Sequence, residues 1–165
     1  MHRADSHLIN GPSQEFYDAL VEREENVIAV HCLDIEEALV QFRVMCRRSG
    51  RSVYHWSGSH GLVSMKASDI SVPGSRKLTD ALRYVLQSMH YGVYVFSGFA
   101  GQLQHSSVEY LRSIAGSRDG YQRKVILLGK DLRLPGVLSD TVYQVFERER
   151  TSLRPRLRDG RWIVS

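Results

Sequence analysis

Short apolar runs alternate with longer segments of helical period along most of this chain. The clearest run covers residues 91–96 and stops abruptly at Ser97 and Gly98, as a buried central strand does. Similar runs occupy residues 27–32, 52–57, 124–128 and 141–146. Strands of a parallel sheet that is covered on both faces read as continuous apolar runs. The pattern therefore predicts five strands joined by helical crossovers.

The segments between these runs repeat apolar residues at three- and four-residue steps, which is typical of helices. The predicted helices cover residues 13–25, 34–50, 78–89, 106–115 and, as a short turn or helix, 134–138. Asp34 is the N-cap of the second helix, with Glu37 as its capping-box partner, and Ser106 or Ser107 caps the fourth. Residues 58–74 predict a flexible connection. Right-handed crossovers between these strands make the fold class α/β, a three-layer fold around a mostly parallel five-stranded sheet.

The length of 165 residues suits one domain with a real core. Residues 1–12 are polar and contain Gly11-Pro12, so we expect a flexible lead-in. Residues 13–149 form the predicted domain. Residues 150–165 form a basic tail or edge hairpin, because Asp159-Gly160 suits a two-residue primed turn.

The net charge of +4 is concentrated at the C-terminal end of the sequence. Residues 150–165 hold five arginines and one acidic residue, namely Arg150, Arg154, Arg156, Arg158 and Arg161 with Asp159. The rest of the chain is therefore electrically neutral. Any attraction for nucleic acid or another anion should begin in this tail.

The sequence contains no apolar run of about 18 residues and no apolar segment after the charges at its N-terminus. We therefore expect no membrane insertion and a cytoplasmic location. Cys32 and Cys46 have no CxxC spacing, which favours two reduced, half-buried thiols over a disulfide or a metal site.

Several short sequence pieces, each at a fixed place in a predicted helix, strand or loop, allow comparison with known families. They are Glu36-Glu37 at a helix start, residues 53–57 followed by Gly61 and Leu62, Ala81-Leu82, residues 93–96 before a loop with Leu103, and residues 125–128 followed by Leu134-Pro135. With the order of elements, they resemble the core of P-loop ATPases. More narrowly, residues 26–147 resemble the degenerate ATPase-like N-terminal domain of a family of AAA proteins from chloroplasts, cyanobacteria and other bacteria.

The resemblance implies a fold without working nucleotide machinery. Many P-loop ATPases carry a carboxylate after the central strand, where this sequence has Ser97-Gly98. No GxxxxGK[ST] motif occurs, and Cys32-Leu33-Asp34 is too short a connection to wrap a phosphate. The family continues into an active ATPase domain, and this sequence ends before one. We therefore expect no enzyme activity and no cofactor.

Two predicted loops follow neighbouring strands of the ATPase-like order and should meet at one rim of the sheet. Residues 56–61 hold Trp56, Ser59 and His60, and residues 97–104 hold Phe99 and Gln102. Residues 58–61 suit either a small anion-binding nest or a plain turn. Phe99 is either a contact residue of the rim or a residue that folds back on the sheet.

The histidines of the sequence include no i, i+4 pair, and we expect no metal site. In the tail, Arg156 and Asp159 also spell the RxxD pattern of some cyclic-dinucleotide sites, although a solvated tail explains the same residues.

These observations predict a non-catalytic module that binds a protein partner or forms a homo-oligomer. The alternatives are a receptor for a nucleotide or cyclic dinucleotide, or a protein that binds nucleic acid through the basic tail. The predicted binding residues are Trp56, Ser59, His60, Phe99, Gln102, Arg154, Arg156, Arg158 and Asp159.

Overall fold

A computed structural model describes residues 14–118, 120, 122–147, 157–158 and 161–162. Its main element is a six-stranded sheet in the order β3-β2-β4-β5-β1-β6. The strands are β1 (Val27–His31), β2 (Val53–Ser57), β3 (Gly61–Ser64), β4 (Gly92–Phe96), β5 (Arg123–Gly129) and β6 (Tyr143–Phe146). The helices are α2 (Gln14–Glu22), α3 (Ile35–Ser49), α4 (Leu78–Gln87), the 3-10 turn η1 (Ala100–Gln102), α5 (His105–Ala115) and α6 (Gly136–Ser139).

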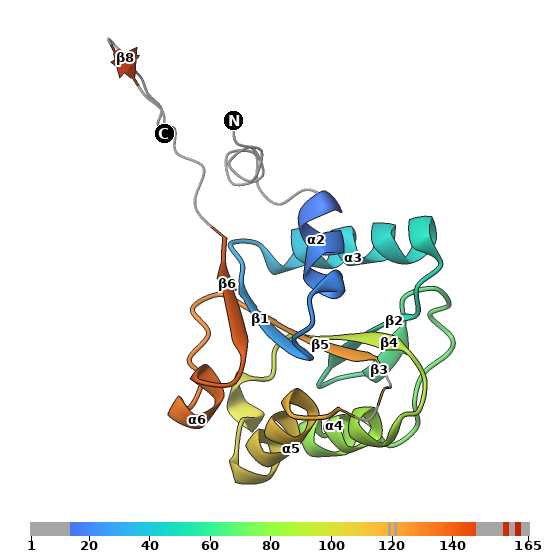
Figure 1. Ribbon diagram of the computed structural model, residues 1–165. Helices are drawn as coiled ribbons and strands as arrows, with labels where there is room; N and C mark the ends of the chain where they lie inside the picture. The colour runs from blue at the N-terminus through green and yellow to red at the C-terminus, as the bar shows by residue number, and fades with distance from the viewer. Residues whose placement is uncertain (1–13, 119, 121, 148–156, 159–160, 163–165) are drawn as a thin grey trace.

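The helices cover both faces of the sheet, which confirms the predicted three-layer α/β fold (Figure 1). Helices α2 and α3 pack on one face, and α4, α5 and α6 pack on the other. Successive residues of a strand point to opposite faces. In β1, accordingly, Ile28 and Val30 join the core beneath α3, while Val27 and Ala29 join the core beneath α4 and α5.

The five predicted strands are all present and mutually parallel, but the sheet has a sixth strand that the sequence pattern missed. Strand β3 pairs antiparallel with β2, so the predicted flexible connection over residues 58–74 begins as a hairpin. Its apolar stretch was too short to stand out. Gly61 has φ +72°, and a Cβ there would lie 2.5 Å from Ser75 Oγ, so the turn requires glycine.

The helix ends agree with the predicted caps in α3 and differ slightly elsewhere. Asp34 Oδ1 accepts a hydrogen bond from Glu37 N at 3.2 Å, and Gly50 ends the helix at φ 73°. The N-cap of helix α5 is Gln104, two or three residues before the predicted Ser106 or Ser107. The backbone N–H of Gln104 donates to Ser107 Oγ at 2.8 Å. The serine therefore lies inside the first turn and bonds back to the cap, whereas the prediction took a serine as the cap itself.

Strand β5 begins with two charged residues whose side chains are almost completely buried, Arg123 and Lys124. The Arg123 guanidinium donates to Leu86 O at 2.6 Å and Ser88 O at 2.9 Å, at the C-terminal end of α4. On the other face, Lys124 Nζ donates to the carbonyls of Arg23 and Glu25, just after α2. Burial lowers the pKa of Lys124. The two cations therefore satisfy carbonyls that a helix end leaves unpaired.

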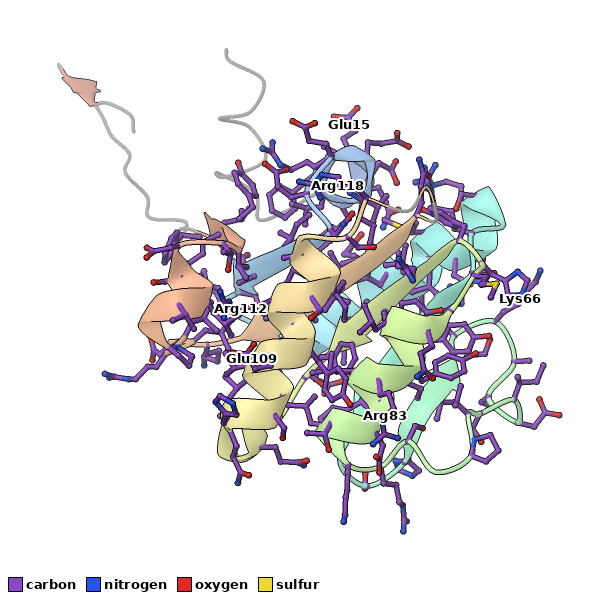
Figure 2. All side chains as sticks on the ribbon, turned by 60° about the horizontal axis from the view of Figure 1, so that its bottom comes forward. Glu15, Lys66, Arg83, Glu109, Arg112 and Arg118 are labelled. Carbon is purple, nitrogen blue, oxygen red and sulfur yellow. The ribbon has the colours of Figure 1, made fainter. Side chains whose placement is uncertain are left out.

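The solvent-facing sides of α4 and α5 carry ordinary surface ion pairs (Figure 2). Arg83 pairs with Asp80 at 2.8 Å and Arg112 with Glu109 at 3.1 Å, each three residues apart on one helix. Exposed pairs of this kind contribute little to stability. They mark the outside of the layer and contrast with the buried Arg123.

Cys32 and Cys46 are both free thiols and are fully buried rather than half-buried. In the described residues, no helix is both long and apolar enough to cross a membrane.

The predicted lead-in, residues 1–12, lies outside the described residues, as does most of the tail. Strands β7 (Leu157–Arg158) and β8 (Arg161–Trp162) pair antiparallel with each other. Their predicted turn at residues 159–160 is outside the described part of the chain, so the hairpin stays a prediction.

Replacing Arg123 by alanine should destabilise the fold strongly. The change leaves the carbonyls of Leu86 and Ser88 without their cation, and we expect a loss of about 2–4 kcal/mol in the free energy of unfolding. Urea unfolding followed by circular dichroism measures it. Arg83→Ala, at an exposed arginine of the same layer, is the matched control and should leave the free energy of unfolding close to the wild-type value. Equal effects of the two changes would contradict the capping role of Arg123.

Candidate functional site

The two loops of the predicted rim lie at the same edge of the sheet. Strands β2 and β4 are direct neighbours, with Trp56 opposite Phe96, so the segments that follow them leave the sheet side by side. Parallel strands present their carboxyl ends on one edge.

Three of the predicted contact residues, Trp56, Phe99 and Gln102, pack against or bond to other parts of the chain at the rim. Trp56 and Phe99 are 0% and 1% exposed, so Phe99 folds back on the sheet, the second of its two alternatives. Trp56 Nε1 donates to Ser75 O at 2.7 Å, and the Gln102 side chain accepts from Leu78 N at 2.9 Å. Trp56 and Phe99 are thus buried in the core, and Gln102, which is half-buried, bonds to the start of α4.

Ser59 and His60, by contrast, are exposed at the tip of the β2–β3 hairpin. Ser59 Oγ and His60 Nδ1 lie 2.9 Å apart, and Arg76 Nε donates to Ser59 O at 3.1 Å. The tip is therefore a polar projection whose hydroxyl and imidazole already bond to each other. Of the predicted rim residues, these two remain accessible to a partner.

His55 in β2 and Ser97 just after β4, which the sequence analysis did not pair, lie within hydrogen-bond distance of each other. His55 Nε2 lies 2.8 Å from Ser97 Oγ, because β2 and β4 bring them to the same face. Burial, and then the charge of Arg43, lower the pKa of His55. Among the described residues, no carboxylate is hydrogen-bonded to His55. The pair is therefore neutral at pH 7 and lacks the third member of a catalytic triad.

The connection from β1 to α3 occupies the place where a phosphate-binding loop would lie. Leu33 N donates to Glu147 Oε1 at 2.8 Å, and Asp34 accepts from Glu37 N. Phosphate-binding loops use such backbone N–H groups at a helix start to hold an anion. Here two carboxylates of the chain itself are the anions. Glu147 N also donates to His31 O at 2.9 Å, which fixes Glu147 beside β1.

A crevice of about 460 Å³ opens next to this connection, at the carboxyl ends of β1, β5 and β6. Its lining includes the stacked rings of His31 and Phe146, whose centroids are 4.0 Å apart, and Lys130 and Arg133 from the loop after β5. Phe146 is 60% exposed. The crossover after β1 runs over one face and the crossover after β5 over the other, so the crevice lies where open α/β sheets commonly bind ligands.

The sequence analysis missed this crevice because its residues come from three distant segments. In the observed sheet the first strand lies between the fourth and the fifth of the predicted strands, an order that the sequence analysis did not state. The prediction followed the loops after the second and third strands instead, and the crevice lies at the ends of the first, fourth and fifth.

In the described part of the chain, no three metal-ligating side chains gather in one place. Arg154, Arg156 and Asp159 lie outside the described residues, and only the backbone of Arg158 is described, in β7. The role predicted for the tail stays a prediction.

Comparison with known protein families places the chain in a family. The family model for the N-terminal domain of SpoVK-like AAA ATPases matches residues 17–146, from α2 to the end of β6. No curated protein matches the chain.

His55 makes the stability of the protein depend on pH. Because burial lowers its pKa below the ordinary 6.5, the unfolded chain takes up a proton that the folded protein resists. Stability from this residue is complete above about pH 7.5 and is lost as the pH falls through 6.5. Replacing His55 by glutamine should therefore reduce the loss of unfolding free energy between about pH 7.5 and about pH 5.

Urea unfolding at the two pH values measures this loss. Ser97→Ala is the control, because it leaves the imidazole buried and should keep the wild-type pH dependence. A wild-type pH dependence in His55→Gln would show that this histidine is not its source.

Proposed function

We propose a function for this chain from one premise: it belongs to the family of SpoVK-like AAA ATPase N-terminal domains. The chain works as a non-catalytic interaction module that binds a protein partner or associates with itself. It keeps the sheet and helices of an ATPase core as a scaffold and uses its surface for binding. Binding through strand-end loops and sheet edges does not need the residues of nucleotide hydrolysis.

The observation that carries this proposal is the carboxylate pair at the start of α3. Glu147 occupies the backbone N–H of Leu33, and Asp34 occupies that of Glu37. A bound triphosphate would place negative charge beside both carboxylates, and like charges at short range repel. The site is therefore satisfied by the chain and is closed to the anion that an ATPase holds there.

The end of β4 supports the same proposal. An ATPase places a carboxylate here to hold the magnesium of the nucleotide complex. Ser97 and the neutral His55 offer neither the charge nor the hard oxygen ligands that Mg²⁺ prefers. At both places the groups of this chain bond within the chain: Glu147 and Asp34 to backbone N–H groups, and Ser97 to His55.

The crevice favours one second candidate function, a receptor that binds a nucleotide or cyclic dinucleotide without hydrolysis. Phe146 offers an exposed aromatic face, and Lys130 and Arg133 are exposed cations beside it. Base stacking and phosphate pairing need these two kinds of group. The candidate differs from the first in one measurable respect, which is saturable stabilisation by a small molecule.

Nucleotides should not stabilise this protein. With ATP, GTP and cyclic dinucleotides at millimolar concentration, we expect no change in the melting temperature and no phosphate release, because Asp34 and Glu147 fill the phosphate position. Thermal shift and a phosphate-release assay measure the two quantities.

A saturable shift with one nucleotide would favour the receptor function instead. It should then disappear in Phe146→Ala and Lys130→Ala and persist in His60→Ala, which lies at the hairpin tip away from the crevice.

The proposed module should associate with itself or with a specific protein. Light scattering measures the first, and affinity capture with the purified chain measures the second. His60→Ala should weaken capture several-fold if the exposed hairpin tip is the contact. It should melt like the wild type, because the exposed His60 imidazole bonds to two neighbouring serine hydroxyls of the same hairpin. A strict monomer that captures no specific protein would overturn the proposal.

A further inference from the structure

The two edge strands of the sheet, β3 and β6, differ in whether described residues bond to their outer sides. The outer side of β3 is covered by the chain itself, since Ser64 N donates to Ile70 O and Val72 N donates to Leu62 O, both at 2.9 Å. Strand β6 forms the other edge, and no described residue pairs with its outer side. An uncovered edge presents unpaired backbone groups to any strand that approaches.

The hydrogen bonds of β6 show which groups face outward. Glu147 N donates to His31 O, so Glu147 faces β1, as do Val145 and Tyr143 at alternate positions. The N–H and C=O groups of Gln144 and Phe146 therefore point away from the sheet. The backbone groups of Gln144 and Phe146 thus face outward on either side of Val145, whose groups face β1. Two copies of such a strand can pair antiparallel, because each outward residue then meets an outward residue of the other copy.

We propose that β6 is a dimer interface, at which a second copy of this chain adds its own β6 antiparallel across a twofold axis through Val145. This inference rests on the proposed interaction function and names its partner. In this register Gln144 of one copy lies opposite Phe146 of the other, and the two exchange both backbone hydrogen bonds. The two six-stranded sheets become one continuous sheet.

Side-chain charges support a second copy in this register. Tyr143 of one copy lies opposite Glu147 of the other, and both point to the face covered by α2. The Arg23 guanidinium lies 3.6 Å from the centre of the Tyr143 ring. Arg23 already pairs with Glu25 of its own chain at 2.8 Å, and the twofold brings each Arg23 beside Glu147 of the partner as a second carboxylate. Glu147 Oε1 is bonded to Leu33, so the approach is to Oε2.

The exposed side chains of the strand agree with a covered edge. Tyr143 and Phe146 are 36% and 60% exposed, and both flank the outward backbone groups. Large apolar residues on an open strand edge are usually a site of pairing. In the proposed dimer, each Phe146 packs along the partner strand beside Gln144.

A cysteine at the twofold axis tests the register directly. In the proposed dimer, Val145 lies opposite its own copy as a non-hydrogen-bonded pair, with Cα atoms about 4.5 Å apart, a distance that a disulfide spans. Val145→Cys should form a covalent dimer on mild oxidation, seen on a non-reducing gel. Gln144→Cys is the matched control and should not, because Gln144 lies opposite Phe146. The native thiols Cys32 and Cys46 are buried, and the wild type measures their background.

Light scattering tests the interface without cross-linking. The wild type should be dimeric, and Phe146→Lys should be monomeric, because it places two like charges on the shared edge. Ile70→Lys is the control: Ile70 is 54% exposed beside the covered edge, and this variant should stay dimeric. Cooperative melting of each variant establishes that it is folded.

The outcomes separate this inference from the function on which it rests. A dimer that survives Phe146→Lys and gives no Val145→Cys cross-link would overturn the β6 interface and leave self-association through another surface. A wild type that is monomeric at all concentrations would also overturn the β6 interface, and the proposed function would then require a different protein as partner.

Discussion

The whole fold depends on burying a parallel sheet on both of its faces. The helices exclude water from the strands, so each polar group near the layers must be bonded by the chain, at a cost of about 1–3 kcal/mol for each one left unpaired. At one end of the sheet, Arg123 and Lys124 meet this demand by bonding to the carbonyls that follow α4 and α2. One strand start thus holds both helical layers in place.

The need to bond each polar group also accounts for the hydrogen bonds at the carboxyl ends of the strands. In an ATPase, the backbone N–H groups after the first strand are satisfied by the phosphates of the substrate. In this chain, Glu147 and Asp34 satisfy such groups permanently, and Ser97 bonds to His55 where a metal-holding carboxylate would lie. These groups are thus bonded within the chain, and the proposed function as a scaffold for protein contacts rests on that observation.

The edges of the sheet obey a different rule from its faces. Faces are covered by apolar helices, but an edge is covered only by another strand or a loop, because its backbone groups need hydrogen-bond partners. The chain supplies residues 70–72 at β3, and among the described residues it supplies nothing at β6. The proposed self-association at β6 rests on the same principle as the hydrogen bonds of Glu147 and Asp34, since both places carry backbone groups that need a partner.

The sequence by itself determined the five parallel strands, the two-sided burial and the caps of α3, because each of these is written in a local period or in a residue at a fixed offset. The family, too, was recognisable from short pieces in chain order. The tertiary structure alone decided the rest. Strand β3 depends on pairing with β2 and on Ser75, the contact of Leu33 with Glu147 joins residues 114 positions apart, and the pair of His55 and Ser97 exists only because β2 and β4 are neighbours. The buried positions of Trp56 and Phe99 likewise reflect how the helices close over the loops, since a loop aromatic in a sequence has no period that tells inside from outside.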